Sequence, residues 1–314
     1  MEPILESAMT AVGELHARGV QPRTVKIRAP FIVGDRWSEP PIQRISAPRG
    51  LNLQLYLIAI FEAHCRKRNG IVGPSPLTVS MGAPDAPSWV DLVVSRAKGN
   101  LQAVNPITER GNRVRQVKSA FARLAAENLA LRNVGTPSKP MAVMLLHESG
   151  ASASEKYDYA VPAAYEVAPS VVTLSELFFM NGWVHLMSDS EIRMYLVLKH
   201  LSARFPRVHK DEGVFCSERE RESLYRISRD VYEAHLALEK FGLIERVRDP
   251  SRHADGKVVN FHQMAASGET LPPHRFRVAG NLALSDFAFA RIRRAMLNFP
   301  LSFAESQRRR ELGV

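Results

Sequence analysis

The side chains with the clearest chemical potential stand close together in residues 113–123. Arginine and glutamine can each form two hydrogen bonds with the base edges of guanine and adenine, and lysine binds phosphate or guanine. The apolar residues of this stretch recur at helical spacing and would form one buried face. The outward face would then carry Arg113, Arg115, Gln116, Lys118, Ser119 and Arg123. This combination is typical of nucleic-acid recognition.

Catalytic and metal-binding motifs are absent from the sequence. There is no GxxxxGK(S/T) phosphate loop, no HExxH zinc motif, no GxSxG nucleophile turn and no HxH pair. The ten histidines are scattered, and the two cysteines, Cys65 and Cys216, lie far apart without CxxC spacing. We therefore expect no enzymatic activity, no cofactor and no bound metal, and a reducing compartment.

The charge of the chain points to a polyanionic partner. The formal net charge is +10, and the sequence pI is about 9.8. Such a balance favours nucleic acid first and an anionic membrane surface second. No run approaches the ~18 apolar residues of a membrane span, and the first residues lack the apolar centre of a signal peptide. We expect a soluble cytoplasmic protein, associated with the nucleoid, without a membrane partner.

Residues 188–261 predict the order helix, short helix, tight turn, helix, strand, polar loop, strand. Two pairs match the capping box that opens a helix, namely Ser188 with Glu191 and Ser217 with Glu220. The third helix spans 229–242, LIERVR is a strand, and KVVNF is the returning strand, which HRFRV could extend or join. This order is the winged-helix layout, in which the third helix enters the major groove and the hairpin lies beside the phosphates.

The candidate contacts of this second unit lie on its third helix, its hairpin and the preceding short helix. The third helix presents Arg229, Asp230, Tyr232 and Glu233. The hairpin carries Arg248, Arg252, His253 and Lys257, and the short helix carries Arg219 and Arg221. Two other interpretations stay open. An alternating run such as SERERE is commonly a solvated face, and a winged helix can also serve as a protein-interaction module.

An internal alignment supports a repeat of the same unit. VKSAFARLAAENLALRNV (117–134) aligns without a gap with VYEAHLALEKFGLIERVR (231–248). In this alignment Asn128 occupies the same position as Gly242, and both residue types tolerate the left-handed conformation that ends a helix. Any two amphipathic helices share apolar periodicity, but here both segments also lead into a strand and a hairpin. We interpret them as a pseudo-repeat.

The two units differ in charge. Between residues 96 and 139, basic side chains far outnumber the acidic Glu109 and Glu127, whereas residues 217–257 are nearly balanced. Counterion release on binding DNA should therefore be larger at the first unit. The first unit would supply affinity, and the second would supply selectivity or serve a dimer.

The sequence thus predicts a mainly α protein with small β-hairpins and two winged-helix units in pseudo-repeat. The expected parts are an N-terminal arm (1–50), the first unit (51–162), the second unit (163–278) and a C-terminal basic helix and tail (279–314). For the C-terminal helix over 282–299, packing on the second unit or dimerisation is favoured over DNA contact.

The chain resembles bacterial tandem winged-helix DNA-binding proteins, the group that includes plasmid replication initiators and regulators of mobile elements. TLSELFFMNGWVHLMSDSEI followed by SRDVYEAHLALEKFGLIERV also looks like actinobacterial helix-turn-helix proteins. The resemblance implies duplex DNA as the partner, often bound by a homodimer, and carries over no catalytic residue. We expect a sequence-specific transcriptional regulator. A replication initiator binding repeated origin sites, or a non-enzymatic segregation or interaction adaptor, are the alternatives.

Overall fold

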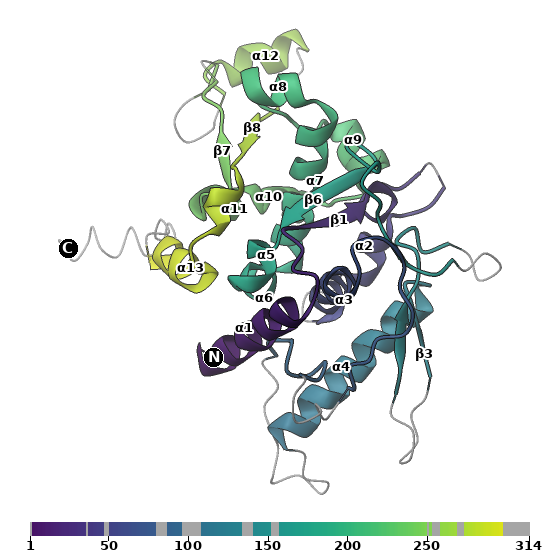
Figure 1. Cartoon of the computed structure of the whole chain (residues 1–314). Helices are drawn as coiled ribbons and strands as arrows, with labels where there is room; N and C mark the ends of the chain where they lie inside the picture. The colour runs from purple at the N-terminus through teal and green to yellow at the C-terminus, as the bar shows by residue number, and fades with distance from the viewer. Residues whose placement is uncertain are drawn as a thin grey trace, which may run out of the picture.

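The computed structural model describes residues 2–35, 37–46, 50–79, 87–95, 108–133, 141–151, 157–249, 251–252, 258–268 and 273–297. It is mainly helical with small antiparallel strand pairs, as the sequence predicts (Figure 1). One continuous cluster of buried apolar side chains extends through both halves of the chain. None of the helices in this described part combines the length and apolar character that crossing a bilayer requires.

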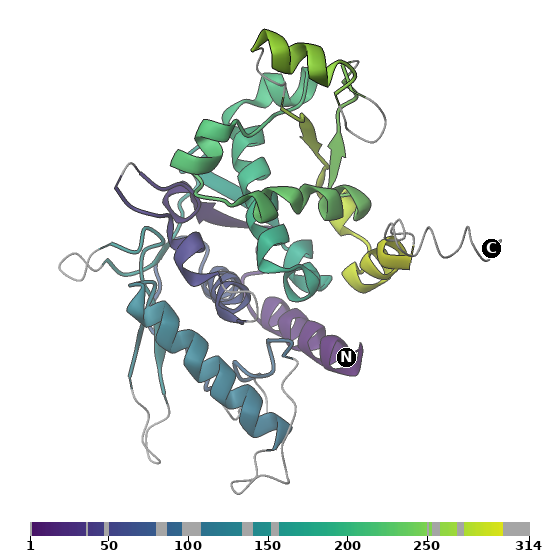
Figure 2. The same ribbon diagram turned by 180° about the vertical axis from the view of Figure 1, so that it is seen from behind.

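The N-terminal residues pack into the body of the protein. Their elements are α1 (Glu2–Arg18), β1 (Thr24–Arg28), the 3-10 helix η1 (Ala29–Phe31) and α2 (Pro41–Ile45), and α3 (Asn52–Arg66) follows them as the first helix of the first unit. The sequence of α3, NLQLYLIAIFEAHCR, is apolar on nearly every face, and a helix of that kind is stable where it is enclosed. Accordingly, Leu53 to Cys65 are all buried, with α1 and α4 on either side of α3 (Figures 1 and 2).

The first unit places a long helix beside a hairpin. It contains β2 (Gly70–Ile71), α4 (Glu109–Ala126), β3 (Ala130–Arg132), β4 (Val143–Leu145) and β5 (Ala160–Val161). Strands β3 and β4 pair antiparallel, with Ala130 opposite Leu145. The backbone N–H of Ser75 donates to the carbonyl of Val143 at 2.7 Å, so a third segment joins β4.

Residues 89–93, which lie between α3 and α4, form turns and no helix. The Asp91 carboxylate accepts hydrogen bonds from the backbone N–H and the hydroxyl of Ser88, at 2.9 and 2.5 Å. The Arg113 side chain binds the carbonyls of Val90 and Val93. These side chains satisfy backbone groups that a continuing helix would otherwise use.

The second unit begins with a ribbon and two short helices. β6 (Val171–Ser175) pairs antiparallel with β1, Thr24 lying opposite Ser175. It continues into α5 (Leu177–Met180) and α6 (Trp183–Leu186). The remaining elements are α7 (Asp189–Arg204), α8 (Pro206–Asp211), α9 (Glu218–Ser223), α10 (Arg229–Glu233), α11 (His235–Lys240), β7 (Ile244–Arg246), α12 (Phe261–Ser267) and β8 (Phe276–Val278).

Both predicted capping boxes are confirmed. At α7, Glu191 N–H donates to the Ser188 hydroxyl at 3.3 Å, and Ser188 N–H donates to the Glu191 carboxylate at 2.7 Å. The same reciprocal pair opens α9 at Ser217 and Glu220. Each box satisfies two backbone donors at a helix start that have no partner within the helix.

The returning strand was predicted in the wrong place. In KVVNF, Val258 forms one bridge to Arg252, and α12 begins at Phe261. The strand that pairs with β7 is β8, within HRFRV, with Ile244 opposite Val278. Phe276 is fully buried, whereas Val259 and Phe261 are about half exposed, so pairing through HRFRV buries more apolar surface.

The aligned segments of the two units end in the same local geometry. Asn128 and Gly242 both adopt the predicted left-handed conformation, with φ of 55° and 73°. The next residue then donates to the carbonyl five positions back, from Leu129 to Leu124 and from Leu243 to Leu238. In the second unit Val214 N–H donates to the Phe276 carbonyl at 2.8 Å, as Ser75 does to Val143 in the first.

This shared helix end yields a stability prediction. Gly242→Ala should lower the free energy of unfolding by about 1–2 kcal/mol, because an L side chain is strained in the left-handed region. The added Cβ would also lie 3.3 Å from a guanidinium nitrogen of Arg291. Asn128→Gly is the matched variant and should change stability by less than about 0.5 kcal/mol. Urea unfolding followed by circular dichroism checks both, and equal losses would contradict the prediction.

The C-terminal elements pack on the second unit. η2 (Asn281–Leu284) and α13 (Ala288–Leu297) follow β8. Ala288 N–H donates to the Asn181 carbonyl at 2.9 Å, and the Asn181 amide donates to the carbonyl of Leu284 at 2.8 Å. Ala288 and Ala295 are buried against the body, whereas Phe287 remains exposed. The expectation that this helix packs on the second unit therefore holds, and dimerisation stays a prediction.

Candidate nucleic-acid interface

The outward face of α4 is the most basic helical surface among the candidate contacts. Val117, Phe121 and Leu124 are buried, so they fix the orientation of the helix. Arg115, Lys118 and Ser119 project from the other side and are exposed. The helix opens at Thr108, whose hydroxyl accepts from Gly111 N–H at 3.0 Å. Arg115 donates to the Asn112 side-chain oxygen at 2.9 Å and remains solvent-accessible.

Three other predicted residues of α4 hold the fold together. Arg113 donates to the carbonyl oxygens of the 90–93 turn, at 2.9 and 3.2 Å. Gln116 accepts a hydrogen bond from the Ser95 hydroxyl. Arg123 forms an ion pair with Glu127 at 3.0 Å and donates to the Arg44 carbonyl at 2.8 Å. Arg113 and Gln116 therefore position α4 against its neighbours. Arg123 is half exposed, but its guanidinium group already binds Glu127 and the Arg44 carbonyl.

In the second unit, the predicted third helix consists of two short helices, α10 and α11, that meet at Ala234. His235 is buried at this junction, and its Nδ1–H donates to the Tyr232 carbonyl at 2.7 Å. The Tyr232 side chain is half-buried, and burial raises the pKa of its hydroxyl to about 12. Tyr232 is therefore partly a packing residue.

The exposed charges of α10 compensate one another. The Arg229 side chain is 85% exposed but forms an ion pair with Glu233 at 2.9 Å. Asp230 beside them is exposed and adds a negative charge. The surface of α10 therefore offers local charges of both signs and little net attraction to phosphate, in contrast to α4.

The remaining predicted residues lie on α9 and near the hairpin. Arg219 is exposed, whereas Arg221 forms ion pairs with Glu218 at 3.5 Å and Glu222 at 3.1 Å. Arg248 is exposed in the segment that follows β7, and Arg252 is largely buried and paired with Asp249 at 3.6 Å. The last two predicted residues, His253 and Lys257, lie outside the described residues.

Arg132 is a basic residue that was not chosen as a contact. It is exposed on β3, at the start of the hairpin that follows α4. The corresponding hairpin residue Arg246 is half-buried and lies 3.6 Å from the Glu239 carboxylate. The internal alignment places these two arginines at the same position, and this could have drawn attention to Arg132.

The described residues contain no cluster of three or more metal-ligating side chains. The chain has no match among family models, curated proteins or solved structures. The features of the chain that bear on its function are therefore the helix α4, the charges on its exposed face and the helix–hairpin geometry that recurs in the two units.

Proposed function

We propose that the protein is a non-enzymatic, sequence-specific binder of double-stranded DNA, acting most simply as a transcriptional regulator on the nucleoid. The observation that carries the proposal is the outward face of α4. Arg115 and Lys118 project there from a helix whose other face is fixed in the core. Arginine suits guanine edges and lysine suits phosphate, so this face combines affinity with base discrimination.

Two winged-helix units present the contacts. In the second unit the succession of α7, α9, α10–α11, β7 and β8 supports this proposal, with α8 between α7 and α9 and α12 between the two strands. Val214 adds a single bridge to β8, at the place of a small third strand. In the first unit α3, α4, β3 and β4 follow the same order, and Ser75 joins β4 in the place of Val214. The turns at residues 89–93 take the place of a second helix.

The dimensions of α4 suit the proposed contact. Its 18 residues extend for about 27 Å. The major groove is about 12 Å wide and admits a helix. Exposed Arg132 on the adjoining hairpin would lie beside the phosphate backbone. The second unit, with compensated charges on α10, would add selectivity rather than a large share of the affinity.

One observation favours the alternative of a replication initiator. The repeat lies within one chain, and its two units present unlike side chains, Arg115 and Lys118 in the first and Arg229 and Tyr232 in the second. A single chain of this kind would recognise a non-palindromic site, because palindromes reflect two identical subunits. Direct repeats of such a site near an origin would support the initiator, and a palindrome over the gene's own promoter would support the regulator.

The proposal is tested by selecting binding sites from random duplex oligonucleotides at two stated salt concentrations. We expect enrichment of a defined motif and an affinity that falls steeply as salt rises. A flat, sequence-independent profile would contradict specific recognition. Failure to bind any duplex at low salt would contradict the proposal as a whole and favour the adaptor alternative.

A further inference from the structure

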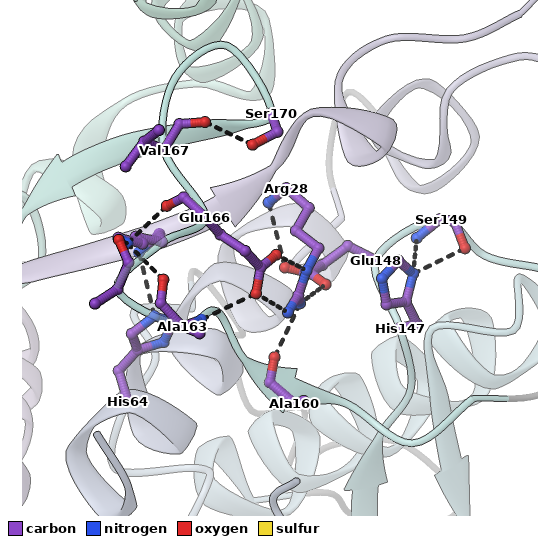
Figure 3. A network of polar contacts seen from close by, with 12 residues as sticks. Arg28, His64, His147, Glu148, Ser149, Ala160, Ala163, Glu166, Val167 and Ser170 are labelled. Atoms are coloured by element: carbon purple, nitrogen blue, oxygen red, sulfur yellow. Dashed lines mark hydrogen bonds and ion pairs between the residues drawn. The ribbon is translucent and has the colours of Figure 1, made fainter. Parts of the chain in front are cut away.

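A charge network joins the N-terminal segment to both units (Figure 3). Arg28, at the end of β1, lies between two carboxylates. Its Nη1 donates to Glu148 at 2.7 Å, and its Nε and Nη2 donate to the two oxygens of Glu166 at 2.8 and 3.1 Å. The Glu148 side chain is completely buried, and Arg28 is largely buried. The guanidinium is therefore held in one orientation by fixed acceptors.

The two carboxylates come from different units. Glu148 belongs to the first unit and follows its hairpin, where Leu146 N–H donates to the Leu129 carbonyl just beyond α4. Glu166 belongs to the second unit and lies shortly before β6. Arg28 also donates to the Ala160 carbonyl at 2.9 Å. The Arg28 side chain thus binds both the segment that follows the hairpin of α4 and the segment that leads into β6 and α7.

Lys26, on the same strand, makes a parallel set of contacts. Its ammonium group donates to the carbonyls of Ala163 and Glu166, at 2.8 and 2.7 Å. Its backbone N–H donates to Nε2 of His64 on α3, at 3.2 Å. His64 Nδ1 lies 2.9 Å from the Ile60 carbonyl and donates to it, which leaves Nε2 as the acceptor. Strand β1 is therefore tied to α3, and its pairing with β6 ties it to the second unit.

Stability alone is a weak reason for this arrangement. Burying an ion pair costs desolvation, and apolar side chains of similar size often serve stability equally well. Directional hydrogen bonds, in contrast, specify one geometry, because a small rotation between the units would leave a buried charge without its partner. The apolar contacts between the units, such as the stacking of Phe61 on Phe179, do not have this directionality.

We propose that Arg28, held between Glu148 and Glu166, is a positioning residue that fixes the orientation of α4 relative to α10 and α11. The effect of Arg28 on DNA affinity rests on the proposed function, whereas its effect on the angle between the units does not. Two helices held at one angle bind a single duplex with little loss of orientational freedom, so the fixed angle raises affinity for a site that matches both units.

A change in this orientation is detected by electron–electron distance measurements. Spin labels are attached at Ala126→Cys, at the end of α4, and Lys240→Cys, at the end of α11, both of which are exposed positions. The native thiols, Cys65 and Cys216, are buried. We expect one narrow distance distribution in the parent protein and a clearly broader or shifted one in Arg28→Met/Glu148→Gln. The double variant removes both buried charges, so that neither is left without a partner.

Two further variants keep the test decisive. Glu166→Gln removes one carboxylate at a partly exposed position, and it serves if the double variant does not fold. Arg18→Met/Glu14→Gln removes an exposed ion pair on α1 and should leave the distribution unchanged. We call Arg28→Met/Glu148→Gln and Glu166→Gln the brace variants. If they fold and keep the parent distance distribution, the inference is overturned.

The DNA readout separates this inference from the proposed function. Affinity for the selected site should fall about tenfold or more in the brace variants, whereas affinity for random duplex should change by less than about threefold, because single-unit phosphate contacts need no fixed angle. Equal losses on both duplexes would overturn the link to recognition. If the parent binds no duplex while the distance distribution still broadens, the proposed function is wrong and the positioning role of Arg28 stands.

Discussion

Reversing two charges on α4, in Arg115→Glu/Lys118→Glu, should lower duplex affinity by about 100- to 1,000-fold near 0.1 M salt. Both side chains are exposed on the free face of a helix whose opposite face is buried, so the change leaves the core intact. Each lost phosphate contact removes the release of a counterion, and each new carboxylate adds repulsion from the phosphates. The effect should therefore exceed that of neutral substitutions at the same positions.

The salt dependence of binding identifies the cause. The slope of log K against log salt should become shallower by about one, because Lys118 is the proposed phosphate contact, whereas Arg115 is proposed to read a guanine edge. Fluorescence anisotropy with the selected duplex at several salt concentrations measures both quantities. Circular dichroism and thermal unfolding should match the parent protein.

A matched control separates a local contact from net charge. Arg207→Glu/Lys210→Glu on α8 changes the net charge equally at two exposed positions. α8 and α4 lie at opposite ends of the molecule in both views (Figures 1 and 2). We expect the control to change affinity by less than about threefold, because charges beyond the Debye length of about 10 Å are screened. Similar losses in both variants would mean that α4 is not the interface.

Local sequence patterns predicted local structure well. The capping boxes at Ser188 and Ser217 and the left-handed residues Asn128 and Gly242 depend on neighbours within about five residues. The apolar periodicity of α4 likewise identified which face is buried. In each case the residue type and its near neighbours contain the whole physical cause.

Pairings between distant segments were not predictable in this way. KVVNF has the composition of a strand, but β7 pairs with the later HRFRV, where Phe276 can be fully buried. β1 pairs with β6, almost 150 residues later in the chain. The contacts of Arg28 join three separate segments, and no motif or spacing relates them.

The candidate site was predictable only in part for a related reason. Helical periodicity distinguishes the outward face of α4 from its buried face, but it does not tell which outward side chains meet another segment. Arg113 and Gln116 meet the turns around residues 90–95, whereas Arg115 and Lys118 remain exposed. Whether an arginine binds a carbonyl or a phosphate is decided by tertiary structure, which the periodicity does not contain.

Acid should destabilise the protein well above the range in which ordinary carboxylates titrate. Burial lowers the pKa of His64 and of His185 from 6.5 to about 4. Both are neutral in the folded state near pH 6, whereas they bind protons at about pH 6.5 when the chain is unfolded. A lowered folded pKa gives stability that is present above the unfolded pKa and is lost as the pH falls. The relevant window therefore runs from about pH 6.5 down to about pH 4.

Each of the two histidines should remove about 3 kcal/mol from the free energy of unfolding across this window. A typical domain is stable by about 5–15 kcal/mol, so a combined loss of about 6 kcal/mol is a large fraction of the total stability. Protonation of His64 also removes the acceptor for Lys26 N–H, which would loosen strand β1 from α3. Urea unfolding at half-unit pH steps measures the loss.

His185→Met isolates one of these contributions. Both ring nitrogens of His185 are buried and have no hydrogen-bond partner among the described residues. A methionine of similar volume therefore removes a titrating group without leaving a buried polar atom unpaired. The variant should be at least as stable as the parent at pH 7, and it should lose about 3 kcal/mol less between pH 6.5 and pH 4. His262→Gln, at an exposed position on α12, should keep the parent's dependence. If His185→Met loses as much unfolding free energy as the parent between pH 6.5 and pH 4, protonation of this buried histidine is not a cause of the acid destabilisation.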